Sequence, residues 1–522
     1  MKSPARLRND FMILVVALLA IVWPCGAKAV ATSQTTCPEP LRSGPAGEIW
    51  QAFWDISAFP RLSKHEGPLR EYLKSEASRL GFEVRSDQTG NLLVKMPATA
   101  GREDEPVTVL HAHLDMVGDR IPASRHDFTR DPIVPVVSGD WVTANGTTLG
   151  ADNGIGVATL LGIMRGSVAD HGRLELLFTV DEEGDFTGVY GLTPASFEGR
   201  RLINLDSETE GELNIGCAGG RADRAVIPWN RKPAGGSEVQ AMRVVIGALR
   251  GGHSGVDINR GRANAIRLAG RLLKTIASVV PVRLISIRGG SIDTTIPRDV
   301  TLDAAVPTKH LPILAEMLPL LEKRLRREYA AGDPSIELRV IPILGAVPDA
   351  LSVNDTRRFT EFILDLPCGV QQMSTQFPGL VETSMNPGVI STATGSVILI
   401  SHLQSSSLRV IAELGEKLRQ IVGRIGGTVE AGVPYPPWQT SPDAPLVKKV
   451  SDLYSGLGGS AMRLNVVHAG LECGAIGELI PGMEMVSFGP TIENAHTPNE
   501  RVRIDSVERL RKLLVLLLRE RL

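Results

Sequence analysis

The 522-residue sequence has no excess of charge of one sign, because 56 basic residues are balanced by 58 acidic ones. A strongly basic composition is therefore missing, and we expect no nucleic-acid partner. Apolar residues make up 43% of the chain and charged residues 22%, as in ordinary soluble globular proteins. The length favours two domains over a single hydrophobic core.

Two common motif classes are also missing. Beyond Cys25 the cysteines are widely scattered, as Cys37, Cys217, Cys368 and Cys473. They form neither a compact disulfide framework nor the close pairs of a structural zinc site. The glycine-rich turn at residues 146–156 lacks the Gly-Lys-Ser/Thr ending of a phosphate-binding loop. The sequence therefore indicates neither a thiolate metal site nor a nucleotide phosphate loop.

The apolar run at residues 11–23 is too short to cross a bilayer comfortably. Basic residues precede this run and a small-x-small motif follows it, namely Lys2, Arg6, Arg8 and Ala27-Lys28-Ala29. This order is typical of a secretory signal, so we predict a signal peptide at residues 1–31, cleaved after Ala29 or Ala31. We expect an exported protein, periplasmic or secreted, that is not inserted in the membrane after cleavage. An uncleaved anchor is the alternative.

Helical and strand patterns alternate along the next part of the chain. Residues 47–56 and 63–80 have helical apolar spacing, and residues 82–84, 91–95 and 107–113 have the composition of strands. This alternation predicts an α/β catalytic domain with a mixed, largely parallel sheet flanked by helices. In such a sheet the functional site lies at the carboxyl ends of the strands.

The segment at residues 213–432 has a different sequence pattern, with alternating strands beside amphipathic helices. This pattern predicts an inserted α+β lid domain. We therefore expect the catalytic domain to consist of residues 32–212 and residues 433–522, on either side of the insertion.

Polar side chains end the strand at residues 107–113. His111, His113 and Asp115 occupy alternate positions. Because side chains two residues apart point to the same face of a strand, these groups converge. Burying them is costly unless they have partners. Either a metal ion or a hydrogen-bonded strand end meets this need.

Acidic residues follow two further apolar strands, as Asp181-Glu182-Glu183 and as Asp206. Adjacent carboxylates repel one another unless a cation lies among them, although exposed loop acids are the simpler alternative. Asp152 leads from the glycine-rich turn into a helix predicted at residues 155–164, where a helix N-cap is the alternative role. Acidic groups therefore recur at the expected edge of the sheet.

Histidines and carboxylates in this pattern are typical ligands of two divalent cations, most often zinc, with one carboxylate bridging the pair. Two such ions lower the pKa of a water molecule and polarise a carbonyl group. A carboxylate outside the ligand set then serves as general base, and Glu182 and Glu183 offer one residue for each task. The composition predicts hydrolysis of an amide or ester.

Seven short motifs follow one another in a familiar order: His113-Leu-Asp115-Met-Val, Gly150-Ala-Asp152-Asn-Gly154, Asp181-Glu182-Glu183-Gly184, Asn204-Leu-Asp206-Ser-Glu208, Gly252-His253-Ser254-Gly255, His468-Ala-Gly-Leu-Glu472-Cys-Gly474 and His496-Thr-Pro-Asn499. The chain resembles the aminoacyl-histidine dipeptidase branch, also called cytosol non-specific dipeptidases, of the co-catalytic di-metal metallopeptidases related to glutamate carboxypeptidase. The resemblance extends over nearly all of the chain beyond the predicted signal. It implies a metallodipeptidase that hydrolyses the peptide bond of dipeptides, either of the Xaa-His type or broadly.

The resemblance also implies a ligand set for two divalent ions. His113 and Asp206 hold one ion, and Glu183 and His496 hold the other. Asp152 bridges the two. Zinc is the expected metal, with cobalt or manganese as alternatives.

Catalytic roles follow from the same resemblance. Glu182 is the general base, and Asp115 orients His113. His253, on the lid domain, stabilises the tetrahedral oxyanion of the substrate, with a helix-capping loop histidine as the alternative. His111 is not a ligand in this pattern and is expected to be structural.

Two features depart from the family pattern. Where the family places an arginine on a lid strand to bind the substrate carboxylate, this sequence has Gln404. Arg409 is close in sequence and is the alternative substrate-binding residue. The predicted export signal is the second departure, because relatives are usually cytoplasmic, and it suggests scavenging of external peptides.

Other functions remain open at this point. The metal motifs do not fix the acyl group, so a metal-dependent N-acyl amino acid deacylase on the same scaffold is the alternative enzyme. A catalytically silent binding protein is the alternative from another class, although neither a predicted ligand nor the general base is missing. A small peptide is the expected partner, and a homodimer is left open.

Overall fold

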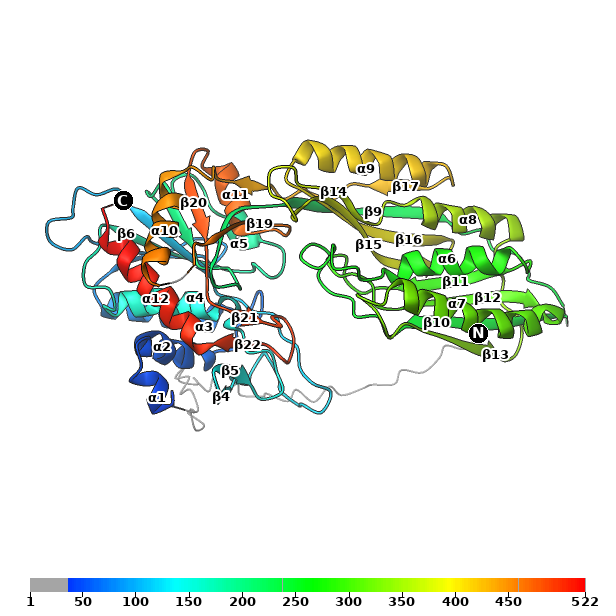
Figure 1. Ribbon diagram of the computed structural model, residues 1–522, viewed down its shortest axis with the longest axis horizontal. Coiled ribbons are helices and arrows are strands. Elements are labelled where there is room, and N and C mark those ends of the chain that lie inside the picture. The colour runs from blue at the N-terminus through cyan, green and yellow to red at the C-terminus, as the bar shows by residue number, and fades with distance from the viewer. Residues whose placement is uncertain (1–35, 237, 459, 522) are drawn as a thin grey trace, which may run out of the picture. The chain divides into compact units, whose positions relative to one another are not determined.

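The computed structural model describes residues 36–236, 238–458 and 460–521 (Figure 1). The predicted signal peptide at residues 1–31 lies outside the described residues. Among the residues that the structure describes, no helix is both long enough and apolar enough to cross a membrane.

A mixed sheet is built from the first and last parts of the chain. Its strand order is β1-β2-β6-β3-β7-β20-β8-β18, with β19 paired to β8. The strands are β1 (Glu83–Ser86), β2 (Leu92–Met96), β3 (Thr108–His113), β6 (Leu174–Thr179), β7 (Arg201–Asn204), β8 (Glu212–Cys217), β18 (Trp438–Gln439), β19 (Arg463–Val467) and β20 (Glu484–Ser487). The central pairs β6–β3, β3–β7 and β7–β20 are parallel, whereas β1–β2, β2–β6 and β8–β18 are antiparallel. This arrangement confirms the predicted α/β class.

The central strands β3 and β6 are buried along their whole length. Apolar strands covered on both faces are typical of parallel sheets. Alternate residues point to opposite faces, so Leu110 and Leu176 join one hydrophobic cluster and Val109 and Leu177 join another. The sheet is therefore held by a core on each side.

Helices accompany this sheet: α1 (Glu39–Arg42), α2 (Gly47–Ser57), α3 (Gly67–Arg79), α4 (Ala151–Met164), α5 (Thr187–Tyr190), α10 (Pro445–Gly456), α11 (Glu472–Leu479) and α12 (Ile504–Arg519). Helix α12 buries Val507, Leu510 and Leu514, whose spacing places them on one face. Helix α2 buries Trp50 and Phe53, whose rings meet edge to face at a centroid distance of 6.2 Å. Amphipathic spacing thus explains why these segments are helical and which face each one buries.

Helix α4 begins earlier than the sequence predicts, at Ala151 rather than near residue 155. Asp152 and Asn153 nevertheless have non-helical backbone angles, and the peptide bond between them is cis. The glycine-rich turn therefore runs directly into the helix and delivers Asp152 at its first turn. The helix beyond is almost wholly buried, which its apolar residues on every face allow.

A second sheet is antiparallel and has the order β13-β10-β12-β11-β15-β16-β9-β17, with β14 paired to β15. Its strands are β9 (Gly219–Pro228), β10 (Val239–Gly247), β11 (Arg283–Gly289), β12 (Val300–Pro307), β13 (Glu337–Ile343), β14 (Gly369–Met373), β15 (Val381–Ala393), β16 (Ser396–Ser405) and β17 (Thr428–Glu430). The helices of this segment are α6 (Ala265–Ala277), the short 3₁₀ helix η1 (Thr308–His310), α7 (Leu311–Glu328), α8 (Val353–Asp365) and α9 (Leu408–Gly423). The lid-domain bounds at residues 213 and 432 stay a prediction.

A small antiparallel sheet, with the order β21-β22-β5-β4, joins segments that are far apart in the sequence. Its strands are β4 (Pro135–Ser138), β5 (Trp141–Ala144), β21 (Ile492–Glu493) and β22 (Arg501–Arg503). Sequence patterns did not predict it, because such short strands show too little alternation. The sheet fixes both ends of the loop at residues 494–500, which carries His496.

Candidate metal centre

The predicted ligands gather because the strands that carry them are neighbours in register. Strand β3 pairs in parallel with β6 and with β7, and His113 lies opposite Thr179. The segment at residues 181–183 follows the end of β6, and Asp206 follows the end of β7. Because parallel strands end at the same edge of a sheet, all of these side chains reach one place.

His113 is at the centre of this group and is 1% exposed. Its Nε2 atom lies 3.3 Å from Asp152 Oδ1 and 3.4 Å from Asp206 Oδ1. Asn153 donates a hydrogen bond of 2.8 Å from Nδ2 to Asp206 Oδ1. His113, Asp152 and Asp206 are close enough to share one cation, because their ligand atoms lie within 4.8 Å of one another.

His496 forms a second group on the other side of Asp152. Its Nε2 atom lies 2.8 Å from Glu183 Oε1 and 3.3 Å from Asp152 Oδ2. The ligand atoms of Asp152, Glu183 and His496 again lie within 4.8 Å of one another. Asp152 thus turns one oxygen toward each histidine, as a carboxylate that bridges two cations does.

Burial and mutual contact shift the pKa values of Asp152, Glu182, Glu183 and His496. Burial raises the pKa of Glu182 well above its ordinary value, and it raises the pKa of Glu183 as well. Burial also opposes ionisation of Asp152, yet hydrogen bonds with His113 and His496 hold its pKa far below the usual range. Burial lowers the pKa of His496, but Asp152 and Glu183 outweigh it and raise that pKa to about 12. The carboxylates therefore attract positive charge strongly.

The geometry fits divalent cations better than direct hydrogen bonding. Glu183 Oε1 is buried and makes no hydrogen bond with any residue that the structure describes, although His496 Nε2 is only 2.8 Å away. The two atoms are therefore close without an aligned hydrogen bond, an arrangement that a cation between them would stabilise. Imidazole and carboxylate donors in such sets suit zinc and similar ions.

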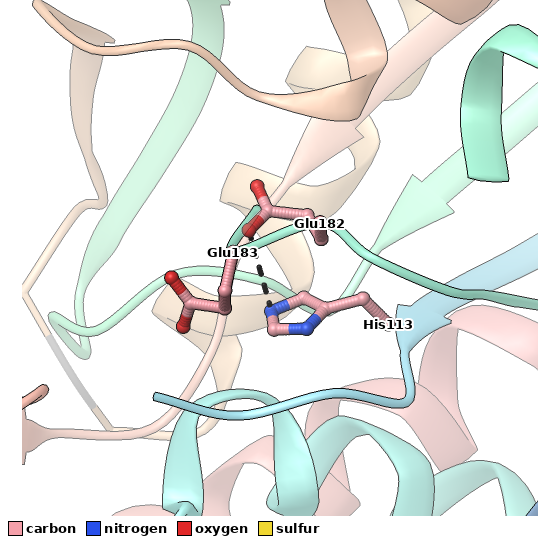
Figure 2. A group of neighbouring side chains, drawn as sticks. All are labelled: His113, Glu182 and Glu183. Atoms are coloured by element: carbon pink, nitrogen blue, oxygen red, sulfur yellow. Dashed lines mark ion pairs between the residues drawn. The ribbon is translucent and has the colours of Figure 1, made fainter. Parts of the chain in front are cut away.

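The two consecutive glutamates face different parts of the site (Figure 2). Glu182 Oε2 lies 4.0 Å from His113 Nε2, whereas Glu183 contacts His496. The backbone N–H groups of Glu182 and Glu183 each donate a hydrogen bond of 3.0 Å to Asp115, one to each carboxylate oxygen. Asp115 Oδ1 also lies 3.3 Å from His113 Nδ1. Asp115 therefore positions the two glutamates as well as the histidine.

His111 lies two residues before His113 on the same strand. Its Nδ1 atom is 2.9 Å from Asn204 Oδ1, and its Nε2 atom is 3.0 Å from Thr179 Oγ1 and 3.1 Å from Glu472 Oε2. These partners are all buried. In the structure His111 therefore belongs to a hydrogen-bonded network and not to the groups of candidate ligands.

His253 is held in one tautomer by its own loop. Its Nδ1 atom accepts hydrogen bonds of 3.1 Å from the backbone N–H groups of Gly255 and Val256. Burial and the charges of other histidines lower the pKa of His253 to about 4. The ring is therefore neutral at pH 7, and its proton lies on Nε2, which is left as a hydrogen-bond donor.

The two predicted carboxylate-binding residues lie in unlike surroundings. Gln404, on β16, is 2% exposed, and its Nε2 atom lies 3.4 Å from both the Tyr435 hydroxyl and the His468 carbonyl. The Arg409 side chain, on α9, is 78% exposed and lies 2.5 Å from Glu413. The packing around Gly255 brings the His253 loop against His468 and the Gln404 amide. The structure thus brings Gln404, and not Arg409, into contact with this loop.

Two buried charged residues support the site and were missed in the sequence. Glu500 accepts hydrogen bonds of 2.7–2.8 Å from the backbone N–H groups of Leu149, Gly150 and Ala151. Arg61 donates hydrogen bonds of 3.0 Å to the carbonyls of Leu114 and Asp115, and it also bonds the Gly150 carbonyl. Glu500 thus ties the turn that carries Asp152 to the loop of His496. The only sequence signal was the place of Glu500, directly after the His496 motif.

Comparison with known proteins supports a peptidase. The model of peptidase family M20/M25/M40 matches residues 109–520. The cytosol non-specific dipeptidase of Escherichia coli is 37% identical over 480 residues, which cover 90% of this chain and 97% of that protein. The crystal structure of the aminoacylhistidine dipeptidase of Vibrio alginolyticus is also 37% identical, with a TM-score of 0.75 and coverage of 92% of this chain and 99% of that chain.

A more distant structure shares the fold alone. The aminopeptidase PepT of Bacillus cereus superimposes with a TM-score of 0.53 at 16% identity, over 92% of this chain and 100% of that chain. The dipeptidase branch named from the seven motifs is confirmed by the two closer relatives.

The expectation of an exported, periplasmic or secreted enzyme is wrong. The Escherichia coli relative is named a cytosol non-specific dipeptidase, and that finding overturns the export interpretation. Basic residues before an apolar run are a compositional signal, and composition does not show that the segment is used for export. The suggested role in scavenging external peptides depended on export, so it is wrong as well.

We predict that Glu500→Gln weakens metal binding by about 10- to 100-fold, because groups that orient metal ligands typically have effects of this size. The amide keeps the volume of the side chain but cannot accept hydrogen bonds from three backbone N–H groups with both oxygens. Competition with a chromogenic chelator measures the affinity. Glu493→Gln is the matched control, since Glu493 lies in the same segment but forms a partly exposed pair with Arg501. Equal affinities in wild type and Glu500→Gln would contradict the role.

Proposed function

The chain belongs to peptidase family M20/M25/M40, and we propose that it is a dipeptidase that uses two divalent metal ions, preferably zinc. Membership makes it a peptide-bond hydrolase. The dipeptide substrate is supported by two relatives of 37% identity, one named a non-specific dipeptidase and the other an aminoacylhistidine dipeptidase. The observation that carries the metal proposal is the position of Asp152, with one carboxylate oxygen toward each histidine.

We assign the ligands from the resemblance to the family together with this geometry. His113 and Asp206 would hold one ion, Glu183 and His496 would hold the other, and Asp152 would be shared between them. When bound, such ions would polarise the scissile carbonyl and lower the pKa of a water molecule. The protein contributes a buried pocket of carboxylates whose repulsion the ions relieve, and Asp115 and Asn153 fix the orientation of the ligands.

Glu182 has the properties of a general base. It lies beside His113, and with His113 and Glu183 it forms a third group whose ligand atoms lie within 4.8 Å of one another. We leave Glu182 outside the ligand set so that its carboxylate is available to carry a proton. Burial raises its pKa, and a carboxylate with a raised pKa both accepts and donates a proton near neutral pH. In the proposed reaction Glu182 takes the proton of the attacking water and delivers it to the leaving amine.

His253 supplies a hydrogen-bond donor for the oxygen of the scissile carbonyl. The loop amides occupy Nδ1, which places the proton on Nε2, and Nε2 makes no hydrogen bond with any residue in the described parts of the chain. A neutral imidazole that donates from a fixed direction stabilises the oxyanion that develops on the substrate carbonyl. This role agrees with the place of the loop against Gln404, where the carboxyl end of a dipeptide is proposed to lie.

A substrate panel tests the function. We expect metal-replete protein to hydrolyse dipeptides, including Xaa-His, in preference to N-acetyl amino acids. Chelation is expected to abolish this activity and added zinc, cobalt or manganese to restore it. Hydrolysis rates for each substrate are measured beside metal content by elemental analysis. Activity in protein shown to be metal-free would reject the metal proposal, and a preference for N-acetyl amino acids would favour a deacylase instead.

The two glutamates are expected to differ in a paired substitution. Glu182→Gln is expected to keep its metal and to lose about 100- to 10,000-fold in kcat, because the amide cannot carry the proton. Glu183→Gln is expected to lose metal, because a ligand is removed. Metal content and kcat are measured for both variants, and each serves as the control for the other. Equal loss of metal in both would show that the division of roles is wrong.

Because residue 404 is a glutamine, we expect weak binding of the substrate carboxylate. A neutral amide cannot reproduce the bidentate, charge-assisted contact of an arginine. Such contacts contribute about 1.5–3 kcal/mol, roughly one to two decades in affinity. We therefore expect a high KM for free dipeptides and little loss when the carboxylate is blocked as an amide.

The matching variant is Gln404→Arg, which is expected to lower KM for the free acid and not for the amide. Arg409→Ala is the control, because Arg409 is exposed and already paired with Glu413. KM values for both substrate forms are compared among the three proteins. A strong preference for the free acid in wild type and in Arg409→Ala alike would show that another residue binds the carboxylate.

A further inference from the structure

We propose that the part of the substrate site at Gln404 selects an amide N–H, and not a carboxylate, as the group that follows the second residue of the substrate. The proposal rests on the dipeptidase function proposed above and narrows its substrate class. It stands on the orientation of the Gln404 amide, whose nitrogen contacts the protein and whose oxygen is left as an acceptor. The preferred substrates are then dipeptide amides and tripeptides, ahead of free dipeptides.

The His468 carbonyl sets the direction of the Gln404 amide. Gln404 Nε2 lies 3.4 Å from this carbonyl oxygen. Because a carbonyl oxygen only accepts hydrogen bonds, the amide atom beside it is the nitrogen and not the oxygen. The nitrogen also lies against the backbone of the His253 loop, since a Cβ atom at Gly255 would be only 3.1 Å from it. The nitrogen side of the amide is thus covered by the protein.

A chain of polar side chains holds the second contact of the amide nitrogen. Gln404 Nε2 lies 3.4 Å from the Tyr435 hydroxyl, which lies 3.1 Å from His402 Nε2. His402 Nδ1 lies 2.8 Å from Asp293 Oδ2. With the His402 ring in its Nδ1–H tautomer, Asp293 accepts from Nδ1, and Nε2 accepts from the Tyr435 hydroxyl. The hydroxyl oxygen in turn accepts from Gln404, so the network favours one orientation of the amide.

The oxygen of the Gln404 amide stays available to a ligand. Gln404 Oε1 makes no hydrogen bond with any residue that the structure describes, because both contacts of the side chain use Nε2. The residue is only 2% exposed, yet this oxygen, unlike Asn153 Oδ1, is not one of the wholly covered polar atoms without a partner. An acceptor in such surroundings normally has a partner, and a substrate N–H would supply it.

The place of Gln404 on β16 turns its side chain away from the hydrophobic core. Leu403, the preceding residue, belongs to the core cluster of the antiparallel sheet. Successive side chains of a strand point to opposite faces, so Gln404 and His402 share the other face. The loop of His253, the proposed oxyanion donor, packs against Gln404. The free acceptor therefore lies on the side of the sheet where the substrate is proposed to bind.

The charge near Gln404 also disfavours a substrate carboxylate. The hydrogen bond with His402 lowers the pKa of Asp293, so Asp293 is ionised at pH 7. Its side chain is 26% exposed, and in the described parts of the chain it is paired with His402 and with no lysine or arginine. A substrate carboxylate at Gln404 Oε1 would face a carbonyl oxygen, with this second carboxylate beyond it. An amide N–H would instead donate a hydrogen bond to the same oxygen.

Steady-state kinetics of the metal-loaded protein test the proposal. Three substrates share their first two residues: the free dipeptide, its C-terminal amide and a tripeptide. We expect KM for the amide to be about 10-fold lower than KM for the free acid, because one hydrogen bond is gained and one repulsion is avoided. The tripeptide separates the two sources of the N–H. Its cleavage after the first residue with a KM like that of the amide assigns the site to any following amide, and its resistance assigns the site to terminal amides.

Two variants examine the acceptor and its support. Gln404→Met removes the acceptor at similar length and is expected to bring the two KM values to within about twofold of each other by raising KM for the amide. Tyr435→Phe leaves Gln404 in place but removes the hydroxyl that positions its nitrogen. It is expected to reduce the preference for the amide in KM while kcat stays near wild type, whereas a general structural defect would lower kcat for every substrate. Gln420→Met, an exposed glutamine on α9, is the matched control and is expected to keep wild-type KM values.

The outcomes that contradict the proposal differ from those that contradict the proposed function. In wild type, a KM for the amide equal to or above that for the free acid would overturn it. A preference for the amide that persists in Gln404→Met or, where that variant does not fold, in Tyr435→Phe would overturn it as well. Hydrolysis of none of the three substrates would instead reject the dipeptidase function itself.

Discussion

Repulsion among buried carboxylates is the constraint on which this structure depends. Asp152, Glu182, Glu183 and Asp206 meet at the end of one sheet, and burial alone disfavours the charge of the first three. They are held together because neighbouring parallel strands end at the same edge. Cations at this place would remove the repulsion, and the histidines between the acids are positioned to share in binding them.

The residues around the centre hold the carboxylates against this repulsion. Asp115 accepts hydrogen bonds from the backbone of both glutamates, so one carboxylate fixes the orientation of two others. Glu500 accepts backbone hydrogen bonds from the turn that carries Asp152, and Arg61 ties that turn to the end of β3. The loops of the candidate ligands are therefore parts of one bonded frame, which would hold two ions at a fixed spacing.

Charge is distributed unevenly over the mixed sheet. One end of its parallel strands gathers acids around His113, and the other end gathers arginines around Arg201. In the antiparallel segment, His253 is kept neutral and Gln404 contributes an uncharged amide. A substrate between His113 and Gln404 would meet strong charge at the scissile bond and weak charge at its carboxylate, so turnover and substrate selectivity would depend on different residues.

The sequence by itself determined the α/β class and the family branch, because both are encoded in short apolar runs that end in fixed polar motifs, whereas the metal ligands that it predicts stay a prediction. It misjudged the N-terminal segment, where composition was the only signal. Only the tertiary structure showed the short sheet behind His496, the start of α4 at Ala151, and the roles of Glu500 and Arg61. Those features depend on contacts between segments hundreds of residues apart, and periodicity within one segment carries no information about such contacts.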